Sequence, residues 1–404
     1  MYRLLSGLTV IEASSFVASP TAGLYLAQMG AEVIRIDQTG GGPDFRRWPR
    51  GPSGFSLYWE NLNRAKKSVA LDLSRPEGRA LMQRLAASTG QFITNFPVDG
   101  FLAHDRLAAL NPDLVTVRIM GQANGGPALD YTVNAAVGIP GMTGPADLDD
   151  EPVNHVLPAW DLLSGSYAAF AMLAAIRNRD ATGAGQEVRI PLADVAIGTV
   201  ANLGMLAETV LEGHDRARLG NTVYGAFGRD FTTRDGARLM LMAITPRQWS
   251  GMVEVLGIAA EVAVIEQARG VSFASDEGVR FEHRDVLFPL VEARVAAWDR
   301  AALEAALTAK GGCFGFYGSM TEAAQDPVLV TENPMFGRTD NPSGLDYAAP
   351  GPFATLPTAA RGAPVRAPRL GEHTGEVLSR LLGLGDGEIG GLAVEGLVAL
   401  DQDL

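Results

Sequence analysis

Residues 5–37, LSGLTVIEASSFVASPTAGLYLAQMGAEVIRID, carry the pattern that decides the fold. Leu8–Glu12 is a short apolar run typical of a buried parallel strand, and Thr21–Met29 has the apolar spacing of a helix. Gly30 stands where such a helix ends, and Glu32–Asp37 is a second run with β-branched residues. Because crossovers between parallel strands are nearly always right-handed, a strand, a helix and a strand in this order predict a parallel sheet covered by helices.

Further alternating segments extend this pattern along the chain. They predict strands at Ser68–Leu73, Gln91–Asn95, Leu114–Ile119 and Gln186–Ile190, and helices at Pro76–Ala87, Asp161–Arg179 and Leu192–Leu211. From about Gly220 the pattern changes, with a hairpin predicted at Ala226–Thr232 and Ala237–Ala243 and helices around Pro246–Leu256 and Phe288–Ala309. Pro342–Pro368 indicates an extended connection, and Gly371–Leu382 returns to a helical pattern. The fold class expected is therefore α/β, with a smaller α+β part in the middle of the chain.

Composition narrows the classes of function. The chain has 404 residues, of which 47% are hydrophobic and 20% charged, as expected of a packed globular protein. A net charge of -13 argues against a nucleic-acid partner, which needs a basic surface. Cys313 is the single cysteine, so a disulfide within the chain and a cysteine-rich zinc site are excluded, and the scattered histidines predict no metal site. With no run of eighteen apolar residues, we expect a cytoplasmic protein without a membrane span.

The loop after the first strand bears on a dinucleotide cofactor. A nicotinamide-binding fold would place G-x-G-x-x-G there, but the sequence is EASSFVASPTAG, so an oxidoreductase of that kind is disfavoured. Asp37 is then better explained as a polar strand end than as a ribose ligand. After the glycines at 40–42 come Arg46, Arg47 and Arg50, which suit either a carboxylate or phosphate ligand or a solvated loop.

Asp161 opens an apolar helix after a proline, in VLPAWDLLSGSY. It fits a helix N-cap, and it also fits a carboxylate nucleophile that the helix N-terminus would keep ionised. His155, six residues earlier, suits either a donor to a substrate carboxylate or a histidine of the core or a loop. The residues alone leave both pairs of alternatives open.

Four segments in order resemble the family III (CaiB/BaiF-type) CoA-transferases. They are residues 5–37, NRAKKSVALDLSRPEGRALMQRL followed by FITNFP, Trp160–Gly165 running to RNRDATGAGQEVRIPLADV, and APRLGEHTGEVL near the end of the chain. The resemblance implies a Rossmann-like large domain built from both chain ends, a small middle domain, and an interlocked-ring homodimer. It places the large domain at 1–215, the small domain at 216–340, and a linker with the C-terminal return at 341–404.

The resemblance also assigns roles to residues. Asp161 matches the catalytic aspartate. The positions that contact CoA match Val17, Ala18, Leu71, Asp72, Leu73, Asn95, Phe96 and, near a basic position of the family, His104. Gln38 departs from the basic residue that often follows the second strand. The α-methylacyl-CoA racemases of a related branch need a His-Asp pair before the catalytic aspartate, and Leu129 here occupies the histidine position, so α-proton abstraction is disfavoured.

Longer motifs, among them GGGPDFRRWP, DYTVN, NHVLPAWD, YGAFGRDF and TENPMF, resemble one branch of the family, the mesaconyl-CoA C1–C4 CoA transferases. That branch moves CoA between the two carboxyls of one mesaconate, with CoA as part of the substrate and no permanently bound cofactor. The residues we expect to hold the dicarboxylate are Arg47, His155, Tyr224 and Arg229. Two rival predictions remain: an intermolecular CoA-transferase with a separate acceptor acid, and a non-catalytic CoA- or nucleotide-binding protein.

Overall fold

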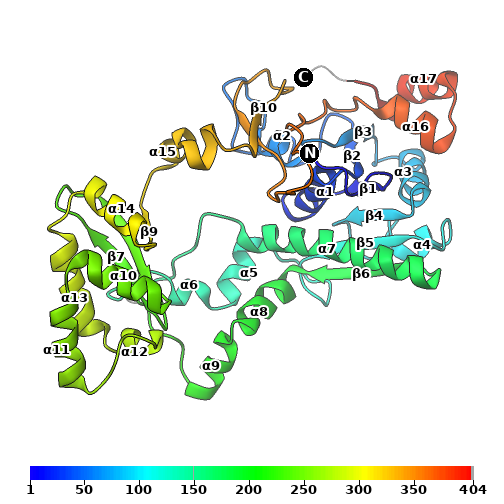
Figure 1. The fold of residues 1–404 in the computed structure, drawn as a ribbon. Coiled ribbons are helices and arrows are strands. Elements are labelled where there is room, and N and C mark those ends of the chain that lie inside the picture. The colour runs from blue at the N-terminus through cyan, green and yellow to red at the C-terminus, as the bar shows by residue number, and fades with distance from the viewer. Residues whose placement is uncertain (149, 402–404) are drawn as a thin grey trace. The chain divides into compact units, whose positions relative to one another are not determined.

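A computed structural model describes residues 1–148 and 150–401. The chain forms two compact units, which are treated separately below (Figure 1). Unit 1 contains residues 1–137, 155–210 and 324–404, and unit 2 contains residues 138–154 and 211–323. The domain limits expected from the sequence differ from these bounds, because residues 138–154 group with unit 2 and unit 2 ends at 323 instead of 340.

Unit 1 is built on a seven-stranded sheet of order β12-β3-β2-β1-β4-β5-β6. All neighbouring strands pair in parallel except β12, which pairs antiparallel with β3. The strands are β1 (Thr9–Ala13), β2 (Glu32–Gln38), β3 (Lys67–Leu71), β4 (Gln91–Thr94), β5 (Val115–Met120), β6 (Gln186–Pro191) and β12 (Val398–Ala399). A large parallel-sheet α/β domain is thus confirmed. The strand order reverses on either side of β1, and the carboxyl ends of the strands at such a point are where open α/β sheets bind ligands.

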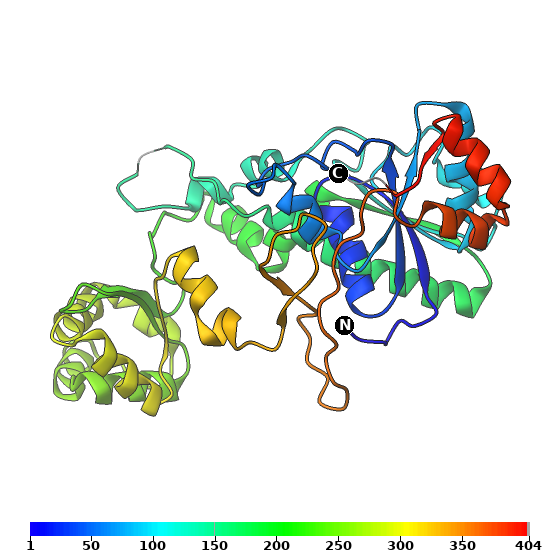
Figure 2. The same ribbon diagram turned by 90° about the horizontal axis from the view of Figure 1, so that it is seen from above.

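Helices cover both faces of this sheet because successive side chains of its strands point to opposite sides. Val10 packs with helices α1 (Ala18–Gln28) and α7 (Ala159–Thr182), while Ile11 packs with α3 (Pro76–Ser88) and α16 (Thr374–Leu382). Figure 2 shows α16, in red, on the side of the strands away from α1. Unit 1 also contains α2 (Leu57–Leu62), α4 (His104–Ala108), α5 (Asp130–Ala136), α8 (Leu192–Asn202), α17 (Asp386–Val394), a π-helical turn (Pro327–Thr331) and the β10–β11 pair (Phe336–Arg338 and Ala348–Pro350).

The helix expected at 192–211 is two helices. α8 ends at Asn202 and α9 (Met205–Glu212) begins after Gly204, and the two are bent by 68°. Gly204 has a φ of +78°, which a residue with a side chain adopts only at a cost. The apolar spacing continued through the glycine, and it therefore concealed the break.

Unit 2 surrounds a three-stranded antiparallel sheet of order β7-β8-β9. Its core is aromatic, with Phe227, Phe231 and Trp249 buried together. Its elements are α6 (Ile139–Met142), β7 (Phe227–Thr232), β8 (Arg238–Ala243), α10 (Pro246–Leu256), α11 (Ala259–Arg269), α12 (Glu277–Glu282), α13 (Arg284–Val295), α14 (Arg300–Ala309) and β9 (Cys313–Phe316); α15 (Met320–Gln325) lies at its end. The single helix expected at 288–309 is therefore α13 and α14.

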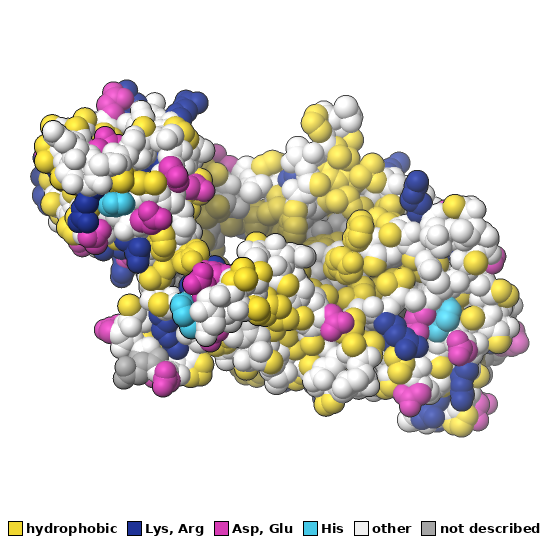
Figure 3. Space-filling model, turned by 90° about the horizontal axis from the view of Figure 1, so that it is seen from below, with side chains coloured by type: hydrophobic (Ala, Val, Ile, Leu, Met, Phe, Trp, Pro, Cys, Tyr) yellow, Lys and Arg dark blue, Asp and Glu magenta, His cyan; other side chains and the backbone are white. Residues whose placement is uncertain are grey.

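Helix α7 is long and apolar enough to cross a membrane by length and composition, and the bent α8–α9 pair also passes that test. One side of α7 packs on α1 and the sheet, through residues such as Ala168 and Met172. Its other side exposes Leu163, Tyr167 and Phe170. Figure 3 shows many hydrophobic side chains on the face of the molecule that it draws.

Candidate active site

The backbone at the start of α7 is held by a carboxylate from another helix. The N-cap is Pro158, so Asp161 lies in the first turn and is not the cap. Asp130 of α5 accepts hydrogen bonds at Oδ2 from the backbone N–H groups of Trp160, at 2.7 Å, and Asp161, at 3.0 Å. The Trp160 indole donates to Asn134 Oδ1 at 3.0 Å, which ties the same helix end to α5 a second time. The N-cap interpretation of Asp161 is wrong, because a buried residue 31 positions earlier supplies the cap.

The Asp161 carboxylate therefore does not serve as the helix cap, and its surroundings shift its pKa. Burial is the largest cause that raises its pKa, to about 6, and the neighbouring Asp130 raises it further, while Arg47 lowers it. The sequence predicts that the helix N-terminus favours the ionised form of Asp161, whereas burial acts on its pKa in the opposite direction. At pH 7 such a group is still mostly ionised, and a carboxylate with a raised pKa is a stronger base than an ordinary one.

His155 lies beside this helix end with its ring close to two aromatic rings. Its centroid is 6.2 Å from that of Tyr131 and 6.5 Å from that of Trp160. Both ring nitrogens are buried, and neither has a hydrogen-bond partner within the described part of the chain. Buried imidazole nitrogens are normally paired, so these two fit a polar ligand.

Arg47 lies over two aromatic rings, with its guanidinium carbon 5.2 Å from the centroid of Phe16 and 5.5 Å from that of Tyr58. Tyr58 is a site residue that the sequence did not reveal. Its hydroxyl is buried without a hydrogen-bond partner in residues 1–148 and 150–401. Burial raises the Tyr58 pKa, Arg47 lowers it and Asp161 raises it, so the three groups share one electrostatic neighbourhood. The Arg50 side chain instead donates a hydrogen bond from Nε to the backbone carbonyl of Arg46.

Except for His104, the CoA-contact positions predicted by resemblance lie at or just after the carboxyl ends of β1, β3 and β4. Val17 and Ala18 begin α1 after β1, and Leu71 ends β3, followed by Asp72 and Leu73. The loops after β1 and β4 are bound together. Asn95 Oδ1 accepts from the Ser15 N–H at 3.2 Å, and Asn95 Nδ2 donates to the Ser15 carbonyl at 2.9 Å.

Arg118 organises the loop that starts with Asn95 and Phe96. It is fully buried on β5 and donates to the carbonyls of Phe96 at 2.7 Å, Pro97 at 2.9 Å and Leu102 at 2.8 Å. His104, after this loop, has Nδ1 2.9 Å from Thr116 Oγ1, and burial lowers its pKa. A neutral imidazole suits a hydrogen bond better than a charge pair with phosphate.

Tyr224 and Arg229 lie in unit 2, whereas Asp161, Arg47 and His155 lie in unit 1. Arg229 forms an ion pair with Glu292 at 3.1 Å and lines a cavity of about 660 Å³ within unit 2. Tyr224 packs against Phe281, with ring centroids 5.1 Å apart. No cluster of three potential metal ligands occurs in the described residues.

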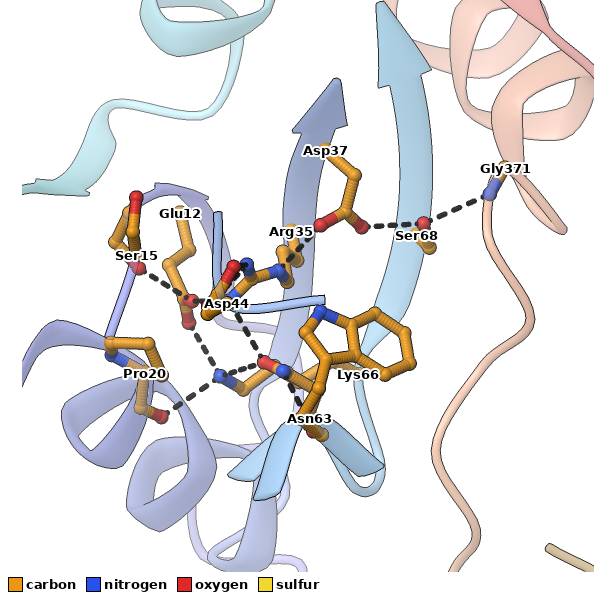
Figure 4. Close-up of polar contacts among 12 residues, drawn as sticks. Glu12, Ser15, Pro20, Arg35, Asp37, Asp44, Asn63, Lys66, Ser68 and Gly371 are labelled. Atoms are coloured by element: carbon orange, nitrogen blue, oxygen red, sulfur yellow. Dashed lines mark hydrogen bonds and ion pairs between the residues drawn. The ribbon is translucent and has the colours of Figure 1, made fainter. Parts of the chain in front are cut away.

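A buried charge network supports the loop after β1 (Figure 4). Arg35 pairs with Asp37 at 2.7 Å, with Asp44 at 3.0 Å and with Glu12 at 3.5 Å. Lys66 pairs with Glu12 at 2.8 Å. Asp37, expected to be an ordinary strand end, is therefore part of the interior charge network. Asp44 also accepts the Phe16 N–H at 3.2 Å, and so the network reaches the loop itself.

The raised pKa of Asp161 leads to a test by pH. On the prediction that Asp161 is the nucleophile, we expect kcat/KM to fall below about pH 6, because protonation would remove its nucleophilic form. In Asp130→Asn the amide oxygen still caps the helix, but a negative charge beside Asp161 is lost, so the acid limb shifts to lower pH. The pH profile of kcat/KM for the two proteins measures this. An unshifted limb would show that Asp130 does not act on the titration of Asp161.

The comparisons with known proteins cover nearly all of this chain. The model of CoA-transferase family III matches residues 5–374. The 2-methylfumaryl-CoA isomerase of Chloroflexus aurantiacus is 43% identical over 406 residues, covering 99% of this chain and 98% of that protein. Succinyl-CoA–D-citramalate CoA-transferase of the same organism is 28% identical, covering 96% of each.

Solved structures agree with the fold. A CaiB/BaiF family protein from Brucella suis has a TM-score of 0.75 and 27% identity, covering 94% of this chain and 100% of that one. The family model spans most of the chain, and one relative is 43% identical along nearly its whole length. The chain belongs to CoA-transferase family III, and its α/β fold with a large parallel sheet matches that of a CaiB/BaiF family protein.

Proposed function

We propose that this enzyme moves CoA between the C1 and C4 carboxyls of mesaconate, converting 2-methylfumaryl-CoA to 3-methylfumaryl-CoA. The observation that carries the proposal is the 43% identity over 99% of the chain to a 2-methylfumaryl-CoA isomerase. The relatives named as succinyl-CoA-dependent transferases are 26–29% identical. The partly buried Asp161, whose carboxylate does not cap the helix, supplies the nucleophile that the reaction needs.

In the first half of the proposed mechanism, Asp161 attacks the thioester carbonyl. The C–S bond breaks, CoA leaves as a thiolate, and a mixed anhydride joins mesaconate to Asp161. The thiolate then attacks the Asp161 carbonyl of the anhydride. Mesaconate leaves as a dicarboxylate, and the enzyme holds an aspartyl-CoA thioester.

In the second half, the other carboxylate of mesaconate attacks the aspartyl thioester and the same steps run backwards. CoA leaves, attacks the mesaconyl carbonyl of the new anhydride, and regenerates the Asp161 carboxylate. One acyl bond is exchanged for another at each step, so the chemistry balances without ATP or an oxidant. Its demands are orientation of the carboxylates and hydrogen-bond donors for the oxyanions.

The remaining roles follow the same proposal. CoA lies along the carboxyl ends of β1, β3 and β4, against Val17, Ala18, Leu71, Asp72, Leu73, Asn95, Phe96 and His104. Arg47 and His155 hold the dicarboxylate near Asp161, and their geometry supports this because Arg47 acts on the pKa of Asp161 and the His155 nitrogens are unpaired within the described chain. From the resemblance, Tyr224 and Arg229, which lie in unit 2, are proposed as further substrate-binding residues.

We further propose a cytoplasmic homodimer. Helix α7 exposes the apolar side chains of Leu163, Tyr167 and Phe170, a surface that suits a second copy of the chain. Sedimentation at micromolar concentration should give twice the mass of 42.7 kDa. A stable monomer would contradict the proposed dimer and would leave the proposed reaction unaffected.

A labelling experiment tests intramolecular transfer. The enzyme is incubated with unlabelled mesaconyl-C1-CoA and an excess of ¹³C-labelled free mesaconate, and the products are resolved by mass. We expect mesaconyl-C4-CoA without label, because the same mesaconate receives CoA back. Labelled product would show that free acid enters, and the enzyme would then be an intermolecular CoA-transferase, the rival prediction.

A further inference from the structure

The carboxylate-rich chemistry at Asp161 creates an electrostatic problem that the site must solve. Mesaconyl-CoA retains one free carboxylate, which approaches Asp161 and the buried Asp130. Like charges that come close together repel strongly in a poorly hydrated site. Arg47 is the cation that lowers the pKa of Asp161, and so it is the group that offsets this repulsion.

The Arg47 backbone is fixed at both ends. Its N–H donates to the Asp44 carbonyl at 3.1 Å, and its carbonyl accepts from Ser56 Oγ at 2.6 Å. Ser56 also caps α2, whose first turn carries Tyr58, by accepting the Trp59 N–H at 3.1 Å. Ser56 thus joins Arg47 to helix α2, which carries Tyr58.

The second aromatic neighbour, Phe16, is held in an unusual conformation. Its φ is +68°, in the left-handed region that costs a residue with a side chain about 1–2 kcal/mol. Asp44 compensates by accepting the Phe16 N–H, and Asp44 is itself held by Arg35 in the interior (Figure 4). The buried network therefore places the Phe16 ring, 37% exposed, under the Arg47 guanidinium.

The Arg47 guanidinium makes no ion pair and no hydrogen bond to any residue that the structure describes, whereas Arg35 nearby forms ion pairs and Arg50 donates to the Arg46 carbonyl. A guanidinium that is stacked on aromatic rings and otherwise unpaired keeps its forked N–H groups for a carboxylate. The hydroxyl of Tyr58, whose ring lies under the Arg47 guanidinium, is also unpaired in residues 1–148 and 150–401 and is a further donor.

We infer that Phe16 and Tyr58 clamp Arg47 as a preformed receptor for the free carboxylate of the acyl group, and that Phe16 is a positioning residue for dicarboxylic over monocarboxylic acyl-CoA. The inference rests on the proposed function. It names the residues that make the enzyme select a dicarboxylic acyl group. The clamp removes rotational freedom from Arg47 before substrate binds, which is how preorganisation raises affinity.

The experiment uses Phe16→Leu, which removes the ring but, being unbranched at Cβ, adds no strain at positive φ. Phe16→Tyr retains the ring as the matched control. For Phe16→Leu we expect KM for mesaconyl-CoA to rise about tenfold, the size of a partly desolvated cation–π contact. The kcat value should change little, and Phe16→Tyr should behave as the wild type.

The dissociation constant of free CoA, measured by calorimetry on the same proteins, separates the possible results. CoA has no acyl carboxylate, so its affinity should stay constant if the clamp acts on the carboxylate. An unchanged KM in Phe16→Leu would overturn the inference, and so would a rise in KM matched by weaker CoA binding, since the loop would then position CoA instead. Wild-type protein inactive on mesaconyl-CoA would instead reject the proposed function.

Discussion

Asp161→Asn is expected to lower kcat by about four orders of magnitude or more, the size seen when a covalent nucleophile is removed. An amide cannot form the mixed anhydride, so no aspartyl-CoA thioester should be trapped by hydroxylamine and seen in the protein mass. The measurement is initial-rate kinetics with mesaconyl-CoA together with the trapping. Turnover near the wild-type rate would reject Asp161 as the nucleophile.

The same variant should remain folded. Asp161 does not cap α7, and the Asp130 bonds to the helix N-terminus do not involve its side chain. Because the folded state raises the Asp161 pKa from 3.8 to about 6, the ionised carboxylate destabilises the fold above pH 6, and that cost disappears as pH falls toward 4. A neutral asparagine removes the cost, so the melting temperature at pH 7 should be unchanged or higher. Asp180→Asn, on the exposed part of the same helix, is the matched control and should keep full activity.

Arg35→Met is expected to give the largest loss of stability. The buried Arg35 faces Glu12, Asp37 and Asp44, and these carboxylates raise its pKa although burial alone would lower it. Without the guanidinium, the counter-charge left to the three buried carboxylates within the described chain would be Lys66, which pairs with Glu12. Leaving buried charge uncompensated costs about 3–5 kcal/mol.

The matched control for that loss is Arg338→Met, which breaks an ion pair that is 71% and 68% exposed. Exposed pairs contribute little, so its unfolding should resemble that of the wild type. Urea unfolding followed by circular dichroism compares the proteins through the first transition, because a chain with two units need not unfold in one step. Equal midpoints for the two variants would mean that the Arg35 network does not stabilise unit 1.

The large sheet was predictable because its signals are local. The apolar runs at 8–12 and 32–37 lie within one residue of the bounds of β1 and β2, since buried parallel strands need little beyond short β-branched segments. The broken helix at Gly204 was not predictable from apolar spacing, because apolar residues continue on both sides of the glycine although α8 buries some of its residues and α9 buries none. Asp161 was singled out from the sequence through resemblance, while its pKa and its free carboxylate depend on Asp130 and Arg47, which are distant along the chain.

By itself, then, the sequence determined the α/β class, the nucleophile candidate and the family to which the segments point. The tertiary structure decided what each polar side chain does. It gave the helix cap to Asp130, buried Asp37 in an ion network, and brought Phe16, Arg47 and Tyr58 together. Strand and helix patterns depend on neighbours a few residues away, whereas charge, burial and unpaired hydrogen-bonding groups depend on residues that only folding brings into contact.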